Sequence, residues 1–282
     1  MRPSAPRLAL RRLDKGPQAR VEAEIRALCA NAHLGDDTAL CRVLGRYKML
    51  VDTRDDDVSA HLLLDGYWEL WVTRVLGGLV RPGMVCVDVG AHLGYFSLLM
   101  ADLTGPTGKV HAFEPNAALR GRLTRSIGIN GFDGITQVHP WPLSDRDGAA
   151  VRLVVPPGRP GGGHIQPAET SGPRASSAVL HTRRLDGFGE IPRVDIVKID
   201  AEASEQAIWS GMAGLVAQGR PLCVILEFVA ERYGDPDAFL NSLTAAGLSL
   251  ELADPRRGLR RTSRVEILAA PAAEDQMLVL RR

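Results

Sequence analysis

A regular alternation of short apolar runs with helix-like segments, from about residue 84 to the end of the chain, most constrains the fold. The runs "MVCVDVG", "GKVHAFEP", "VDIVKID" and "PLCVILEF" are apolar almost throughout, and a segment with helical spacing follows each. Strands that are buried on both faces belong to a parallel sheet with helices on both sides. The last runs, "LSLELAD" and "QMLVLRR", suit a closing antiparallel pair. The pattern predicts a doubly wound α/β fold with a mostly parallel seven-stranded sheet and an antiparallel last strand.

The segment before this alternation has a different pattern. Residues 1–50 are predicted to form a basic tail and a helical extension, because apolar residues recur at helical spacing from Val21 to Leu44. The stretch "YKMLVDTRDDDVS" that follows predicts a short strand or two and then an acidic turn. Residues 51–282 are predicted to form the main domain. Its start, "HLLLDGYWELWVTRVLGGLV", is typical of a helix interrupted by glycine. The stretch "PPGRPGGGHIQPAETSGPR" is too rich in proline and glycine for a regular element, so residues 156–176 are predicted to be either a lid or substrate wall, or an inert insert.

Composition narrows the range of partners. The formal net charge of +1 gives no global field for nucleic acid, and 24% charged residues are ordinary for a globular protein. The four cysteines are scattered without a C-x-x-C pair, which favours a reducing, cytoplasmic location. No run is long and apolar enough for an integral membrane segment, and no secretory signal is apparent. A homo-oligomer remains open, with the Tyr67–Trp71 cluster and the N-terminal helices as contact surfaces.

The turn after the first apolar run is where a ligand is expected. Ligands of open α/β sheets bind at the carboxyl ends of the strands, and Asp88, Gly90 and Gly94 follow this strand directly. In a dinucleotide-binding turn, small residues would stand where this chain has His92 and Tyr95. An imidazole there fills the space of a pyrophosphate, which disfavours NAD and FAD. A nucleoside without a pyrophosphate, such as S-adenosylmethionine, is still accommodated.

Glu114 supports a nucleoside ligand. It ends the second apolar run, where an acid can accept hydrogen bonds from both ribose hydroxyls. A structural interpretation exists for each acid: Asp88 can cap the following helix, and Glu114 can be a solvated strand end. The two acids together with the broken phosphate motif favour S-adenosylmethionine.

Five blocks in order, "VDVGAHLGYFSLLMA", "VHAFEPN", "PLSD", "RRLDGF" and "VDIVKIDAEASEQAIWSGM", resemble the FkbM family of S-adenosylmethionine-dependent methyltransferases. The upstream "DGYWE" is similar to that family's preceding helix. The resemblance implies a class I methyltransferase (Rossmann-like) fold. It also implies transfer of a methyl group to a hydroxyl of a secondary metabolite, such as a polyketide or a sugar, or of a glycan, with S-adenosylhomocysteine as product. The residues that it assigns to the cofactor are Asp88, Gly90 and Gly94 at the methionine end, Glu114 at ribose, Asn116, Ser144 and Asp145 near adenine, and Glu69 closing over it.

One residue departs from the family's pattern. The usual block reads Lys-Ile-Asp-Val-Glu-Gly-x-Glu, whereas this chain has Lys-Ile-Asp-Ala-Glu-Ala-Ser-Glu, with Ala203 in place of glycine. Alanine costs little if its φ is negative, and narrows the pocket if a substrate approaches that backbone. The departure therefore bears on substrate choice more than on methyl transfer.

Two acids of this block are the candidates for catalysis. Asp200 and Glu202 are two residues apart at a strand end, so they share one face if strand geometry continues. An alcohol must lose its proton as it attacks the methyl group, and a carboxylate or a histidine can take it. We expect Asp200 at the cofactor and Glu202 at the acceptor hydroxyl. Glu205 is expected to stabilise the next helix N-terminus instead.

Histidines and metals are less clearly indicated. His92 lies in the cofactor turn and is a second candidate for the catalytic base, and His164 in the glycine-rich loop is a third. No clustered Cys/His pattern indicates a metal site, so none is predicted. Residues 55–57 are acidic but suit a solvated turn. Magnesium that assists loss of the acceptor proton stays an alternative.

Two other classes of function compete with a methyltransferase. A module that binds S-adenosylmethionine without turnover, as a scaffold or sensor, would show binding but no transfer to any acceptor. A nicotinamide-dependent oxidoreductase would bind NAD tightly, which calorimetry with both cofactors distinguishes. The presence of both Asp200 and Glu202 favours an active methyltransferase.

Overall fold

A twisted central sheet dominates the computed structural model, which describes residues 7–10, 13–170 and 178–282. The strands lie in the order β13-β12-β14-β11-β10-β4-β5-β6. From β11 to β6 the neighbours are parallel, whereas β14, β12 and β13 pair antiparallel. The strands are β4 (Val85–Val89), β5 (Lys109–Phe113), β6 (Thr136–His139), β10 (Ile196–Ile199), β11 (Cys223–Phe228), β12 (Ser249–Asp254), β13 (Gly258–Arg261) and β14 (Gln276–Arg281).

This sheet confirms the predicted class I methyltransferase fold, with one difference in strand number. The seven predicted strands are present, and the antiparallel pairing of β12 with β14 is confirmed. An eighth strand, β13, was missed because "GLRR" carries no apolar alternation and is ordered by pairing with β12.

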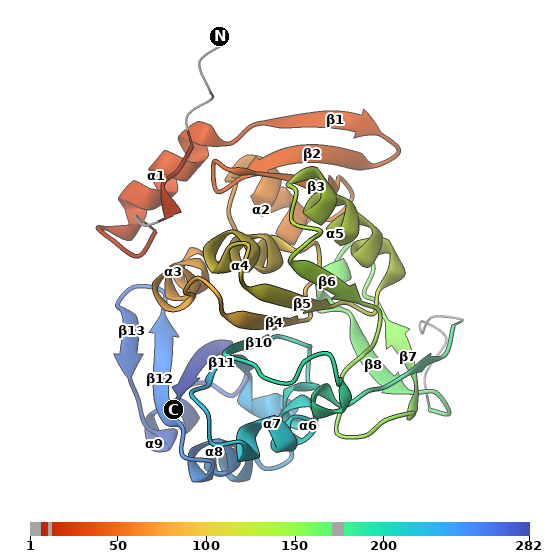
Figure 1. Ribbon diagram of the computed structural model, residues 1–282, viewed down its shortest axis with the longest axis vertical. Helices are drawn as coiled ribbons and strands as arrows, with labels where there is room; N and C mark the ends of the chain where they lie inside the picture. The colour runs from red at the N-terminus through yellow and green to blue at the C-terminus, as the bar shows by residue number, and fades with distance from the viewer. Residues whose placement is uncertain (1–6, 11–12, 171–177) are drawn as a thin grey trace.

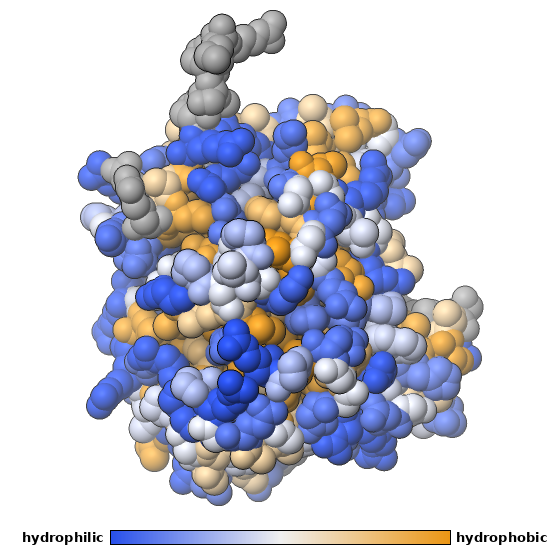
Figure 2. All heavy atoms as spheres, viewed as in Figure 1, coloured by the Kyte–Doolittle hydropathy of each residue, from blue (hydrophilic) through white to orange (hydrophobic). Residues whose placement is uncertain are grey.

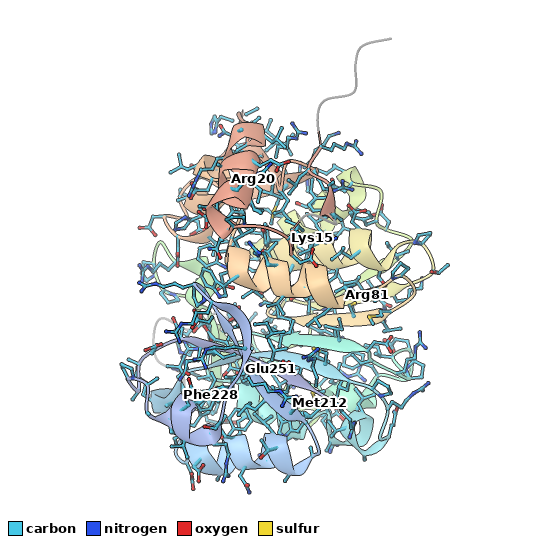
Figure 3. The ribbon with its side chains drawn as sticks, turned by 90° about the vertical axis from the view of Figure 1, so that its left-hand side faces the viewer. Lys15, Arg20, Arg81, Met212, Phe228 and Glu251 are labelled. Carbon is cyan, nitrogen blue, oxygen red and sulfur yellow. The ribbon has the colours of Figure 1, made fainter. Side chains whose placement is uncertain are left out.

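Helices cover both faces of the sheet, and each face has its own apolar core. In Figure 1, α3, α4 and α5 lie above the sheet, and the C-terminal helices lie below it. Within β10, Ile196 faces the upper core while Val197 and Ile199 face the lower one. Figure 3 shows Met212 and Phe228 in the lower half. The helices are α3 (Leu70–Leu79), α4 (Tyr95–Thr104), α5 (Ala117–Ile129), α6 (Glu205–Ser210), α7 (Ala213–Ala217), α8 (Pro236–Ala245) and α9 (Arg264–Leu268).

The predicted helical extension at the N-terminus is only partly correct. Helix α1 (Gln18–Leu28) is present, but residues 31–43 form the strands β1 (Asn31–Gly35) and β2 (Thr38–Val43). They pair in an antiparallel sheet with β3 (Tyr47–Asp52), which confirms the short strand predicted there. Buried and half-buried residues alternate along β2, which is the period of a strand and was read as helical spacing. Residues 36–37 and 44–45 have positive φ and make the two tight turns. Residues 1–6 and 11–12 of the predicted tail lie outside the described residues.

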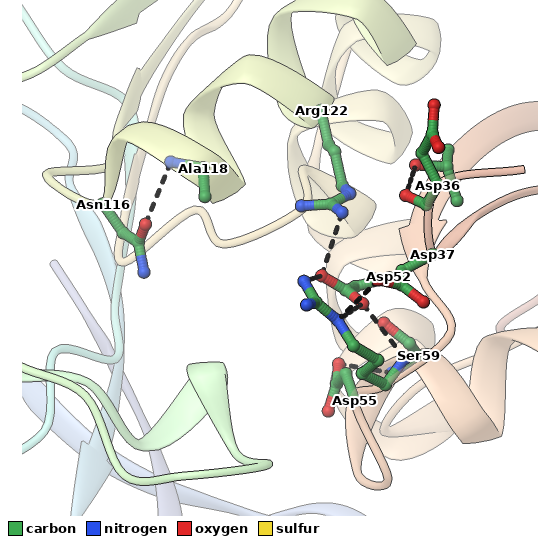
Figure 4. Close-up of polar contacts among 10 residues, drawn as sticks. Asp36, Asp37, Asp52, Asp55, Ser59, Asn116, Ala118 and Arg122 are labelled. Atoms are coloured by element: carbon green, nitrogen blue, oxygen red, sulfur yellow. Dashed lines mark hydrogen bonds and ion pairs between the residues drawn. The ribbon is translucent and has the colours of Figure 1, made fainter.

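This small sheet is held against α5 by polar contacts. Arg122 on α5 donates to Asp52 at the end of β3 over 2.9 Å, and the Leu50 amide donates to the Ser126 hydroxyl over 3.0 Å. Figure 4 shows the Arg122 contact together with Asn116, whose side chain accepts from the Ala118 amide and caps α5. The N-terminal sheet is therefore attached to the helix that begins at the predicted cofactor site.

Two further predictions can be compared with the structure. The predicted helix with a glycine interruption over residues 61–80 consists of two helices, α2 (Val58–Leu64) and α3, and Gly66 and Glu69 between them both have positive φ. The proline- and glycine-rich stretch does hold a strand, β8 (His164–Pro167), which pairs with β7 (Ala150–Val154) beside a short β9 (Leu180–His181). The pairing partner comes from elsewhere in the chain, so local composition did not reveal it. Residues 171–176 of that stretch lie outside the described residues.

None of the helices within the described ranges is long and apolar enough to cross a bilayer. Figure 2 shows hydrophilic residues over most of the face seen in Figure 1, with hydrophobic atoms gathered near its centre.

Candidate functional site

A cavity of about 910 Å³ lies at the carboxyl ends of the parallel strands. The segments that follow β4, β5, β10 and β11 all contribute to its lining, as expected for a doubly wound sheet. Further walls come from α1, from the α2–α3 connection and from residues 161–163 and 165. Of the two interpretations of the proline- and glycine-rich stretch, this placement favours a wall of the site. Tyr67, Trp68 and Trp71 line the same cavity.

The turn after β4 depends on two glycines for different reasons. A Cβ on Gly90 would lie 1.8 Å from the Asp200 carbonyl oxygen, so only glycine lets this turn touch the end of β10. A Cβ on Gly94 would lie 2.1 Å from the Leu123 side chain. Gly94 therefore permits α4 to pack against α5, and it does not line the cavity.

His92 lies in this turn with a φ of 52° and faces the cavity. Its Nε2 is buried and has no hydrogen-bond partner among the described residues. Burial lowers the pKa of His92 to about 4. The imidazole is therefore neutral near pH 7, with a ring nitrogen available at the site.

Glu114, directly after β5, is fixed by backbone amides. One carboxylate oxygen accepts from the His92 amide and the other from the Asn116 amide, each over 2.8 Å. The side chain is 5% exposed, and burial raises its pKa to about 7. Each oxygen has a second lone pair, so this anchored carboxylate can accept two further hydrogen bonds from a ligand in the cavity.

Lys198, a buried cation that the sequence analysis missed, lies beneath the centre of the site. Its ammonium donates to Asp200 over 2.9 Å and lies 4.8 Å from the centre of the Phe96 ring. Burial opposes its charge, but Asp200, Asp88 and Glu69 together raise its pKa above the ordinary value. A lysine inside an otherwise apolar strand was the signal in the sequence.

Asp88 and Glu69 surround this lysine from two sides. Asp88 is 1% exposed, accepts from the Ser97 hydroxyl over 2.6 Å and does not line the cavity. Glu69 lines it from the start of α3, and one of its oxygens is buried without a partner among the described residues. Burial, helped by the charge of Asp200, raises the pKa of Glu69 to about 7.

The acids after β10 belong to a larger cluster than predicted. Asp200 and Glu202 both line the cavity, and Glu202 pairs with Arg232 over 2.9 Å. Arg232 also contacts Glu227, the acid at the end of β11. Burial raises the pKa of Glu202 to about 7 and that of Glu227 to about 8. The sequence signal for Glu227 was an acid ending an apolar run, as Glu114 does.

The loop after β10 contains two consecutive residues in the left-handed region. The φ values of Glu202 and Ala203 are 47° and 71°, and the side chain of Ala203 is exposed and does not line the cavity. Glu205 is buried and accepts from the Ala201 amide over 2.9 Å and from the Tyr233 hydroxyl over 3.0 Å. These bonds agree with the structural role predicted for Glu205.

Several predicted residues do not reach the cavity. Ser144 donates to its neighbour Asp145 over 3.1 Å, and residues 141–143 line the site in their place. His164 contacts Gln166 and is likewise not part of the lining. Asp55 accepts from the amides of Asp57 and Ser59, but it is only 4% exposed, so the predicted solvated turn is wrong at this residue. Within residues 7–10, 13–170 and 178–282, no group of His, Cys, Asp and Glu has the arrangement of a metal site.

Comparison with known proteins places this geometry in a family. The model of the "Methyltransferase FkbM domain" matches residues 88–247. The AMB antimetabolite synthetase AmbE of Pseudomonas aeruginosa is 28% identical over 184 residues, which are 52% of this chain and 8% of that protein. Protein-L-isoaspartate O-methyltransferase of Methanothermobacter thermautotrophicus is 30% identical over 60 residues, or 21% of this chain and 28% of that protein. The chain thus spans well under two thirds of either relative.

The solved structures that match this chain share little sequence identity with it. A precorrin-6y C5,15-methyltransferase from Geobacter metallireducens has a TM-score of 0.44 and 13% identity, covering 81% of this chain and 95% of that one. A tRNA (uracil-54, C5)-methyltransferase from Pyrococcus abyssi has a TM-score of 0.45 and 13% identity, and the match covers 88% of this chain and 44% of that one. The family model, in contrast, extends over more than half of the sequence. The chain therefore belongs to the FkbM family of S-adenosylmethionine-dependent methyltransferases.

Proposed function

We propose that this protein transfers the methyl group of S-adenosylmethionine to a hydroxyl of a small secondary metabolite, such as a polyketide or a sugar, or of a glycan. The observation that supports this most is that one cavity joins the anchored carboxylate of Glu114 to the acids Asp200 and Glu202. The similarity to part of an antimetabolite synthetase favours a secondary metabolite. We propose that nucleic acid is not a substrate. We also propose a reducing, cytoplasmic location, which the scattered cysteines without a C-x-x-C pair favour.

The residues at one end of the cavity fit the cofactor. Glu114 has lone pairs for two ribose hydroxyls, since backbone amides use only one on each oxygen. The unpartnered oxygen of Glu69 and the side chain of Asp200 suit the ammonium group of the methionine part. Gly90, His92 and Asn116 contribute to the same walls. Asp88 and Gly94 lie behind the lining, where Asp88 accepts from the Ser97 hydroxyl and Gly94 leaves room for Leu123. Ser144 and Asp145 follow Leu143, a residue of the lining.

The reaction needs alignment and a proton acceptor. When bound, S-adenosylmethionine supplies a methyl group that its positive sulfur already activates. The walls hold the acceptor and exclude water, which accounts for much of the rate gain in a displacement of this kind. Glu202 takes the proton of the attacking hydroxyl, and a carboxyl with a pKa near 7 is matched to that work. Neutral His92, with its free ring nitrogen, is the second candidate for the base.

The test is transfer of a radiolabelled methyl group to a panel of polyketide, sugar, glycan and nucleic-acid acceptors. We expect label in a hydroxyl-bearing acceptor and none in RNA or DNA. Glu202→Gln should lower kcat by a factor on the order of 100 or more while S-adenosylhomocysteine still binds. Glu231→Gln changes an exposed acid on the turn that carries Arg232 and is the matched control. Binding without transfer to any acceptor, or an unaffected Glu202→Gln, would overturn the proposal.

A further inference from the structure

We infer that Glu227 is a second catalytic carboxylate, joined to Glu202 through Arg232 so that the two acids accept the acceptor's proton as one pair. This inference rests on the proposed function, because it assigns a further residue to the same transfer. It concerns a residue of β11 that lies outside the block containing Asp200 and Glu202.

The geometry places one guanidinium between two carboxylates. Arg232 ends the short 3₁₀ turn η4 (Ala230–Arg232) that follows β11. One of its terminal nitrogens contacts Glu227 and the other lies 2.9 Å from Glu202. All three side chains line the cavity. The planar fork of arginine has fixed donor directions, so it holds the two carboxylates in a defined relation.

The charges around the pair leave it short of cations. Asp200 and Glu205 act on both acids from the segment after β10, and Asp275 acts on Glu202 from the loop before β14. Glu69 faces Asp200 from the start of α3, and Tyr233 donates to Glu205. Lys198 is bonded to Asp200, which leaves Arg232 as the cation bonded to Glu202 and Glu227 among the described residues. One positive charge cannot balance two carboxylates in a half-buried site, so the pair retains a proton near neutral pH.

Such a pair suits the proton that the reaction releases. The acceptor oxygen forms a bond to the methyl carbon, the carbon–sulfur bond breaks with its electron pair on sulfur, and the hydroxyl proton passes to the ionised carboxylate of the pair. The products are a methyl ether, a neutral thioether and a protonated carboxyl, so atoms and charge balance. Arg232 is a positioning residue, since it acts through the two acids.

A purely structural role for Glu227 is the alternative. The η4 turn is already held by backbone bonds from Arg232 to Val229 and from Glu231 to Ala272, each over 3.0 Å. Glu227 therefore is not needed to close the turn. A readout of protonation separates the two roles, because a merely structural contact would not couple the titration of the two acids.

The experiment follows side-chain carboxyl signals of the full chain, labelled with ¹³C-glutamate, as pH changes. The signals are assigned with Glu202→Gln and Glu227→Gln. In each variant the remaining acid keeps its ion pair with Arg232 and no longer faces the charge of the other acid. We therefore expect its titration midpoint to fall by about one pH unit or more. Glu231→Gln, on the same turn, should leave both midpoints unchanged. With the acceptor found in the transfer panel, Glu227→Gln should lower kcat by about tenfold or more and move the acid limb of its pH profile, with the KM for S-adenosylmethionine unchanged.

Each result decides the inference. Midpoints that do not respond to the other acid would overturn the pair, even if methyl transfer is found. A kcat and pH profile of Glu227→Gln equal to those of Glu231→Gln would overturn its catalytic role. Coupled midpoints without transfer to any acceptor would refute the proposed function, and with it the role of Glu227, while the pair itself would stand.

Discussion

Replacing Ala203 by glycine should make the folded chain more stable. The family's usual glycine is absent at this position, yet the backbone keeps the left-handed conformation, with a φ of 71°. The side chain is exposed and does not line the cavity, so the substitution removes no packing and touches no ligand. Only the backbone preference and the entropy of the unfolded chain change.

The magnitude follows from two opposing terms. A left-handed conformation costs an L-residue about 1–2 kcal/mol. Glycine loses more backbone conformational entropy on folding than alanine does. This entropy offsets roughly 0.5–1 kcal/mol of the stabilisation gained by relieving the left-handed conformation. The net stabilisation should be about 0.5–1 kcal/mol, which corresponds to a rise in Tm of about 1–3 °C for a chain of this size.

Urea unfolding of the two proteins side by side measures this difference. Ala269→Gly is the matched control, because Ala269 is also exposed but has a φ of −78°. Glycine there should destabilise by up to about 1 kcal/mol, because it gains more freedom than alanine in the unfolded chain and relieves no backbone strain in the folded one. If Ala203→Gly destabilised the chain as much as Ala269→Gly does, the loop after β10 would not carry backbone strain. The affinity for S-adenosylhomocysteine should be the same in Ala203→Gly and the parent.

Two further predictions concern stability. Gly90→Ala should destabilise the chain by roughly 2 kcal/mol or more in urea unfolding, because its Cβ would lie 1.8 Å from the Asp200 carbonyl oxygen. Gly121→Ala on α5 is the control, since a Cβ there would have nothing within 4 Å and should not destabilise. Equal effects of the two substitutions would argue against the close contact between the turn after β4 and the end of β10. Between pH 6.5 and 8.5 the free energy of unfolding without ligand should fall as pH rises, because burial raises the pKa of Glu114 to about 7 and that of Glu227 to about 8, so the folded state still binds protons that the unfolded chain has released. Glu227→Gln should flatten this slope, and a rise in stability with pH over the same window would contradict it.

The sequence predicted the central architecture because buried parallel strands have a distinct pattern. The runs that became β4, β5, β10 and β11 are apolar nearly throughout, and only a sheet covered on both faces suits them. The strands β1 and β2 were missed because they are short and half or more of their residues are not buried. Their apolar positions fit more than one period, and the hairpin turns use non-glycine residues such as Asp36 and Asp37.

The candidate site was predicted where it depends on strand ends and missed where it depends on packing. Glu114, Asp200 and Glu202 were found because each follows an apolar run. Gly94 was assigned to the ligand, although its lack of a side chain serves the contact with Leu123. Arg232 was missed, because the short turn after β11 brings it to Glu202, which lies far from it in the sequence.

The most direct test of this account is the affinity of the full chain for S-adenosylhomocysteine, measured by titration calorimetry at pH 8 for the parent and for Glu114→Ala. Each hydrogen bond from a hydroxyl to a charged carboxylate is worth about 1.5–3 kcal/mol, and water that enters the site of the missing carboxylate restores part of that energy in the variant. We therefore expect the affinity to fall about 10- to 100-fold. Glu231→Gln should bind as the parent does. Unchanged affinity in a folded Glu114→Ala would contradict the central claim that the carboxylate after β5 holds the nucleoside.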